Sequence, residues 1–141
     1  MKHRLPGLFC LLAALLVCIA AARRDGSRFV RQNQAELTAL AEEVLAAGFG
    51  GDEVSYPGVT RIVYAVYMEA GTFPRPFVEF HTDSLIGYSG FYYSPTDIPV
   101  TFQGADVTLQ KTNTDWAWEH LDNHGTTAKI TDCWYTFEAY L

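Results

Sequence analysis

The chain has 141 residues, enough for one domain with a single hydrophobic core. Hydrophobic residues make up 49% of it and aromatic residues 14%, so a packed core is expected and a wholly disordered chain is not. The formal net charge is −6, and residues 32–141 alone carry four basic and fifteen acidic side chains, a net charge of −11. Because an acidic surface repels phosphate backbones, nucleic acid is not an expected partner.

The N-terminus has a basic start followed by an apolar run. Lys2 and Arg4 precede Leu8–Ala22, an uninterrupted apolar stretch of 15 residues. Such a stretch is either a signal peptide, cleaved near Ala22, or a signal anchor that stays in place as a short transmembrane helix. Two arginines follow the run directly. Positive charge just beyond a cleavage site hinders export, whereas arginines are common flanks of a membrane span, so the anchor is favoured.

Residues 1–25 are therefore predicted to hold the chain at the cell membrane, in contact with the lipid bilayer through residues 8–22. Residues 26–141 are predicted to form one exported domain, and the alternative is secretion after cleavage near Ala22. The four arginines within residues 23–31 would favour a cytoplasmic domain under the positive-inside rule. A very short basic N-terminal tail usually stays inside the cell, which favours the exported orientation.

Residues 29–47 have the period of an amphipathic helix. The apolar stripe consists of Leu37, Leu40, Ala41, Val44 and Leu45. Gly48 supplies the stop, and Gly26-Ser27 are expected to separate this helix from the hydrophobic segment, with Ser27 as its N-cap. The stripe is expected to pack on a sheet.

From residue 60 onward the apolar period becomes two, which is typical of strands. The strand patterns cover residues 60–69, 76–82, 85–94, 105–112 and 127–140. In the third, Tyr88 and Tyr92 fall on one face and Phe91 and Tyr93 on the other, so both faces need cover. The helix stripe can cover one face of the strand. A loop, the curvature of the sheet or a partner would have to cover the other face. One helix followed by about five sequential strands predicts an α+β domain, with the amphipathic helix on one face of a mainly antiparallel sheet.

Several segments carry a resemblance to a family. They include F-V-R-Q-N-Q-A-E-L, G-F-Y-Y-S-P-T-D-I-P, D-N-H-G-T-T-A-K-I and W-Y-T-F-E-A. Together they resemble a family of small membrane-anchored or secreted proteins of Gram-positive, gut-type bacteria, over most of residues 29–141. The resemblance implies a shared domain but no activity, substrate or catalytic residue. The sequence departs from the family in Cys133 and in two histidines near residue 120.

Three histidines are the candidates for a metal site. His120 and His124 are four residues apart beside acidic residues, and His81 could approach from a neighbouring strand. In a helix this spacing would place both rings on one face. The segment is instead predicted as a strand end followed by a tight turn at residues 122–125, with Gly125 able to take a positive φ, which favours exposed turn histidines. Cys133 is expected to be a buried strand residue, because its neighbours do not activate a thiol. The sequence has no P-loop, Gly-x-Ser-x-Gly, Cys-x-x-Cys or HExxH, and no cofactor is expected.

Aromatic residues on the strands are the candidate binding residues. They are Tyr88, Tyr92, Tyr93, Trp116, Trp118 and Trp134. On an exposed face they would stack against sugars or peptides, and otherwise they are core. The sequence predicts a non-catalytic extracytoplasmic domain that binds a protein or a small ligand. A small metal-dependent or hydrolytic enzyme and an inhibitor or immunity-type protein remain as alternatives.

Overall fold

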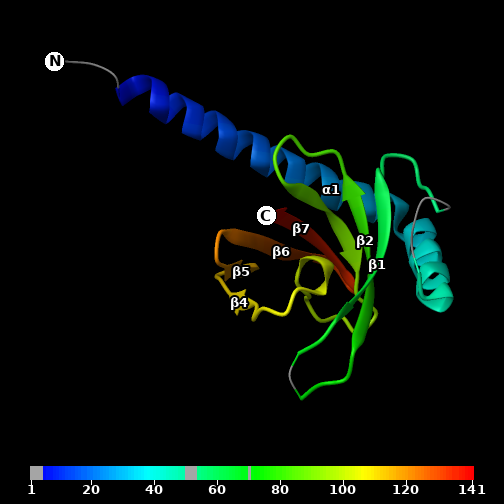
Figure 1. The fold of residues 1–141 in the computed structure, drawn as a ribbon. Helices are drawn as coiled ribbons and strands as arrows, with labels where there is room; N and C mark the ends of the chain where they lie inside the picture. The colour runs from blue at the N-terminus through cyan, green and yellow to red at the C-terminus, as the bar shows by residue number, and fades with distance from the viewer. Residues whose placement is uncertain (1–4, 50–53, 70) are drawn as a thin grey trace.

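A computed structural model describes residues 5–49, 54–69 and 71–141, with side chains from residue 26 onward (Figure 1). One helix packs on a mainly antiparallel sheet, which confirms the predicted α+β fold. The sheet has seven strands rather than about five, in the order β1-β2-β3-β7-β6-β5-β4. The elements are α1 (Leu5–Ala47), β1 (Arg61–Tyr67), β2 (Arg75–Thr82), β3 (Tyr88–Tyr93), the 3-10 turn η1 (Phe102–Gly104), β4 (Gln110–Lys111), β5 (Trp116–His120), β6 (Asn123–Thr131) and β7 (Trp134–Tyr140).

An unrecognised turn accounts for one of the two extra strands, and the other is β5, which lies between the predicted strands 105–112 and 127–140. The predicted strand 127–140 is two strands, because Asp132 and Cys133 form a tight turn in which Cys133 has a φ of +66°. Cys133 is therefore a half-buried turn residue and not a buried strand residue. The turn expected at residues 122–125 lies instead at Leu121 and Asp122, with Leu121 at a φ of +57°.

Two predicted strands are shorter than expected. Of residues 105–112 only β4 pairs with a neighbour, because the preceding residues cross the face of the sheet as a loop and pack Val107 and Leu109 against it. Of residues 85–94, the pairing begins at Tyr88. Gly87 has a φ of +73°, which interrupts the extended chain and leaves Leu85 in an exposed turn.

Helix α1 passes through Gly26-Ser27 without a break, so the expected separation and the Ser27 cap are wrong. The irregularity lies further along, at Asn33, whose φ of −118° and ψ of 17° depart from helical values. There the side-chain amide of Asn33 donates to the carbonyl oxygen of Phe29 at 2.9 Å. The helix ends as predicted before Gly48, which has a φ of +73°.

The predicted signal peptide or anchor lies outside the residues described with their side chains, so the prediction for residues 8–22 stays untested. In the part of the chain that is so described, no helix has both the length and the apolar character needed to cross a membrane.

The sheet has a core on each face. Under α1, the predicted stripe residues Leu37, Ala41 and Val44 are buried against the sheet, and Leu40 and Leu45 pack at the margin. The other face is covered by the segment of residues 94–109, which carries Val100 and Phe102 into a second core. Alternation in β3 is as predicted, with Phe91 and Tyr93 under the helix and Tyr92 under the loop.

Candidate functional site

The six predicted binding aromatics do not share one surface. Tyr93 and Trp134 are buried under α1. The Tyr93 hydroxyl donates to Glu42 Oε1 at 2.6 Å, and the Trp134 indole N–H donates to Thr38 Oγ1 at 3.2 Å. These two rings attach the helix to the sheet.

The other four aromatics lie on the loop-covered face. Tyr92 and Trp118 are buried, Trp116 is half-buried, and Tyr88 is 44% exposed. The Tyr92 hydroxyl accepts from the backbone N–H of Val100 at 3.0 Å and lies 2.7 Å from Thr127 Oγ1. Burial raises the pKa of Tyr92 far above its usual value. Tyr88 is the most exposed of the six, and its ring contacts those of His81 and Phe102.

The three candidate histidines are not brought together. His81 is buried on β2, with Nε2 3.0 Å from Glu79 Oε2, among the rings of Phe102, Phe137 and Tyr88. His120 and His124 are exposed at the ends of β5 and β6, with β3 and β7 between them and β2. Within the described ranges, no group of three His, Cys, Asp or Glu side chains is arranged to hold a metal ion.

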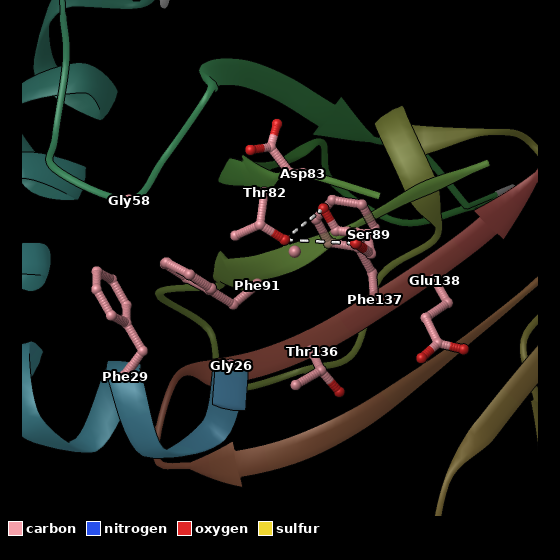
Figure 2. Close-up of a pocket in the computed structure, with 11 residues that line it drawn as sticks. Gly26, Phe29, Gly58, Thr82, Asp83, Ser89, Phe91, Thr136, Phe137 and Glu138 are labelled. Atoms are coloured by element: carbon pink, nitrogen blue, oxygen red, sulfur yellow. Dashed lines mark hydrogen bonds between the residues drawn. The ribbon is translucent and has the colours of Figure 1, made fainter. Parts of the chain in front are cut away.

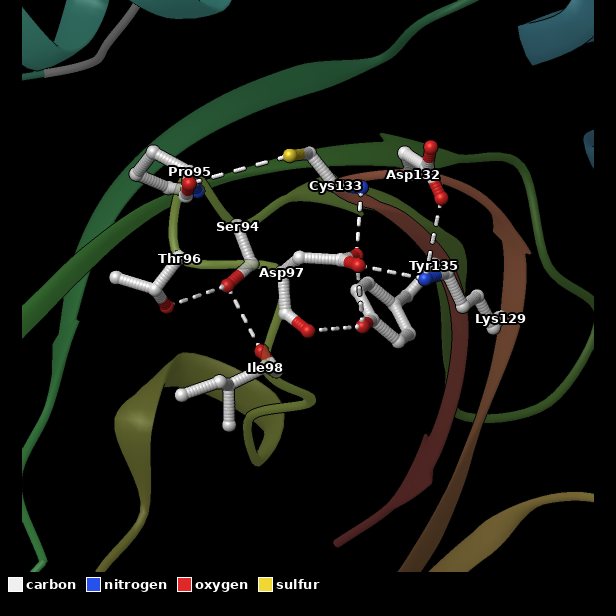
Figure 3. A network of polar contacts seen from close by, with 9 residues as sticks. All are labelled: Ser94, Pro95, Thr96, Asp97, Ile98, Lys129, Asp132, Cys133 and Tyr135. Carbon is white, nitrogen blue, oxygen red and sulfur yellow. Dashed lines mark hydrogen bonds and ion pairs between the residues drawn. The ribbon is translucent and has the colours of Figure 1, made fainter.

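A polar cluster around Asp97 was not expected from the sequence (Figure 3). The Asp97 carboxylate accepts from the Lys129 ammonium at 2.6 Å, the Cys133 backbone N–H at 2.7 Å and the Tyr135 hydroxyl at 3.1 Å. The hydrogen bond from Lys129, followed by that from Cys133, lowers the pKa of Asp97. The cluster attaches the loop after β3 to the β6–β7 turn.

The Cys133 thiol beside Asp97 is not an activated nucleophile. Partial burial, and then the negative charges of Asp97 and Asp132, raise the pKa of the Cys133 thiol. A thiolate is the reactive form, so a raised pKa lowers reactivity at neutral pH. The role of the cluster is therefore structural.

A pocket of about 450 Å³, lined by residues of β4, β5 and β6, includes Trp118 and His124. The candidate site that joins the helix to the sheet is a groove on the helix-covered face, near the end of β2 (Figure 2). Its volume is about 390 Å³, within the range of small-molecule sites. The residues that line it are Gly26, Phe29, Gly58, Thr82, Asp83, Ser89, Gly90, Phe91, Thr136, Phe137 and Glu138. They come from α1, the segment before β1, the end of β2, and strands β3 and β7.

The groove combines an aromatic side with a polar side. The rings of Phe29 and Phe91 lie 5.7 Å apart on the apolar side. On the polar side, Thr82 Oγ1 lies 3.3 Å from the carbonyl oxygen of Ser89 and 3.4 Å from its hydroxyl. Asp83 is an exposed carboxylate at the rim, and none of the described lining residues is basic. The groove therefore suits a flat or apolar group joined to a neutral or cationic polar group.

None of the nine residues proposed from the sequence lines this groove. A signal for it was nevertheless present. Along the strands under α1, the side chains that face the helix change from apolar to polar, from Phe80 to Thr82 on β2 and from Phe91 to Ser89 on β3. The helix cannot cover a polar patch favourably, and the groove begins where this change occurs.

No protein-family model matches the chain, and neither the curated proteins nor the solved structures provide a match. The resemblance to small membrane-anchored proteins stays a prediction.

Proposed function

We propose that this chain is a non-catalytic extracytoplasmic domain, tethered to the membrane or secreted, which binds a ligand or partner in the groove beside α1. The groove carries the proposal. Its floor belongs to β3 and β7, which are inner strands of the seven-stranded sheet and are hydrogen-bonded on both sides. A site on such strands keeps its shape when a ligand binds, which lowers the entropic cost of binding.

The polar contacts of the titratable residues support binding rather than catalysis. Glu79 contacts His81, and Asp97 contacts Lys129, but both pairs hold segments of the fold together and neither lines the groove. The groove itself offers hydroxyl groups, aromatic rings and carboxylates. These groups recognise a ligand by stacking and hydrogen bonding.

The test is photo-cross-linking in intact cells that produce the full chain. Benzoylphenylalanine replaces Asp83 at the groove rim in one strain and Asp106 on the loop-covered face in a matched control strain; both positions are exposed. A discrete adduct formed from position 83 and absent from position 106 supports the proposal. Equal adduct patterns from both positions, or no adduct from position 83, contradict it.

A blocking variant strengthens the test. Ser89→Trp places a large ring in the groove, and the adduct from position 83 is expected to disappear while thermal unfolding stays cooperative. Digestion of the domain by protease added outside the cells tests export separately. Protection of the domain in intact cells, with digestion only after lysis, would contradict an extracytoplasmic location.

A further inference from the structure

Three exposed apolar side chains stand at one end of the sheet. Leu85 is 102% exposed, Ile86 is 66% exposed and Leu121 is 83% exposed. Leu85 and Ile86 lie in the β2–β3 turn, and Leu121 lies in the β5–β6 turn. Residues of this kind at turn tips contribute nothing to the two cores, and apolar side chains that gather on a surface are typical of an interaction site.

The strand register brings the two turns to the same end. Tyr88, which opens β3, pairs with Ala139, and His124, near the start of β6, pairs with Tyr140. Tyr140 joins the two: its ring stacks on His124 at 5.0 Å, and a Cβ on Gly87 would lie 3.0 Å from its Cδ1 atom. We call this end of the sheet, with Leu85, Ile86 and Leu121, the apolar end.

Helix α1 comes onto the sheet at the apolar end. Gly26 lines the groove together with Thr82 and Asp83, which directly precede the β2–β3 turn. Gly26 is only four positions after Ala22, the last residue of the apolar N-terminal run. Four residues span at most about 14 Å when extended, and about 6 Å in a helix. The apolar run therefore ends close to the apolar end of the domain.

We propose that the apolar end rests on the lipid–water interface of the membrane that holds residues 8–22, with Leu85, Ile86 and Leu121 in contact with lipid. This inference rests on the membrane tether of the proposed function. The tether confines the domain close to the bilayer, so the effective concentration of lipid at the apolar end is high. A small apolar surface can therefore bind the bilayer. Arg23 and Arg24, between the run and the domain, suit the phosphate layer.

Acidic residues at the same end limit the depth of the contact. Asp83 and Asp122 are exposed; Asp83 directly precedes the β2–β3 turn, and Asp122 lies in the β5–β6 turn. Because charged side chains are costly in hydrocarbon, these carboxylates keep the domain at the headgroup level and do not permit insertion. The groove then opens beside the membrane surface, where an amphipathic ligand would be concentrated.

The opposite end of the sheet supplies a matched control. Phe73 is 91% exposed in the β1–β2 turn, at the bottom of Figure 1. Like Leu85 it is apolar and almost fully exposed, but the register places its turn at the other end of β2. A general affinity of exposed apolar residues for lipid would affect both positions equally.

The experiment uses the full chain in phosphatidylcholine vesicles. Cys10, Cys18 and Cys133 are replaced by alanine, and a nitrobenzoxadiazole label is attached to Leu85→Cys, Leu121→Cys or Phe73→Cys. Flotation shows whether the chain binds the bilayer, and doxyl-labelled lipid reports the contact of each label with lipid. Labels at positions 85 and 121 are expected to lose more than half of their emission, and the label at position 73 very little.

Each outcome decides the inference. If the protein binds vesicles and the labels at positions 73, 85 and 121 are quenched equally, the lipid contact of the apolar end is overturned, but the membrane tether is not. A chain that does not float with vesicles overturns both the tether and the lipid contact. A third outcome is that the labels at positions 85 and 121 are shielded from water but are not quenched by doxyl lipid, and that the chain cross-links to itself. This outcome would assign the apolar end to contact between two copies and would overturn the lipid contact.

Discussion

The carboxylate of Glu79 accepts a hydrogen bond from the backbone N–H of Gln103, with 2.6 Å between oxygen and nitrogen. Glu79 is 1% exposed, and Gln103 lies in η1 with a φ of +51°, in the left-handed region that non-glycine residues seldom adopt. The other oxygen of the same carboxylate contacts His81. One buried side chain on β2 thus fixes the segment that covers the second core.

The first prediction is that Glu79→Ala destabilises the domain by about 3 kcal/mol, because it leaves the N–H of Gln103 and a buried ring nitrogen of His81 without their partner. Urea unfolding followed by far-ultraviolet circular dichroism measures the change. Glu69→Ala is the control. Glu69 binds Arg75 at 2.8 Å, but its side chain is 53% exposed, so a loss below about 1 kcal/mol is expected. Equal losses in the two variants would show that Glu79 does not hold the loop.

The second prediction concerns acid stability. The folded state holds the pKa of Asp97 below its usual value of 3.8, so the protonated form is favoured more in the unfolded chain than in the folded one. The stabilisation is complete only well above pH 3.8, and it is lost as the pH falls through 3.8 and then through the lowered pKa. In Asp97→Asn the side-chain amide oxygen can still accept the hydrogen bond from the Cys133 N–H, but the acid-dependent contribution to stability is absent because the amide does not titrate. Thermal unfolding between pH 2 and pH 7 is expected to show a smaller decline in Tm for the variant.

The third prediction is that Cys133 reacts slowly with iodoacetamide. Its thiol pKa is raised by burial and by the negative charges of Asp97 and Asp132, so few thiolates are present at pH 7. Peptide mapping by mass spectrometry measures the rate at this cysteine separately from the others. Asp132→Asn removes one of the charges at a side chain that is 92% exposed, and a faster reaction is expected. A rate above that of free glutathione at the same pH would rule out a deactivated thiol.

Local periodicity was enough to predict the layers of the fold from the sequence. The period of residues 29–47 identified Leu37, Ala41 and Val44 as the buried stripe, and the alternation in β3 separated Phe91 from Tyr92 correctly. Both predictions follow from the angle between successive side chains along a helix or a strand. This angle depends only on the local backbone, so a short stretch of sequence is enough to read it.

Turns and the site were harder to predict, because they depend on contacts between distant residues. Cys133 and Leu121 take positive φ values, although neither residue type favours them. Cys133 is held in its turn by Asp97, which is 36 positions away in the sequence. Gly125 was expected to form a turn, yet it lies within β6, where a Cβ would approach Trp118 Nε1 to 2.5 Å. The groove likewise joins residues from five separate segments.

The last prediction uses two glycines that both line the groove. Gly26 lies inside α1, and a Cβ there would meet no atom within 4 Å. Alanine is a better helix former than glycine, so Gly26→Ala is expected to stabilise the domain by about 1 kcal/mol. Gly90 lies in β3, and a Cβ there would be 2.0 Å from the carbonyl oxygen of Phe80 and 2.9 Å from the Phe137 ring. Strands β2 and β3 would have to separate, so a loss of about 3 kcal/mol is expected for Gly90→Ala.

Chemical unfolding of the two variants beside the unmodified chain measures both changes. The substitution is the same in each case, so the difference between the variants reports the surroundings of the two glycines and not the added methyl group itself. Stabilisation by Gly26→Ala would support a helix that is continuous from the N-terminal segment into the domain. A loss of stability in Gly26→Ala would indicate that the helix is interrupted at Gly26-Ser27, as predicted from the sequence. The apolar run would then not be held by a continuous helix close to the apolar end.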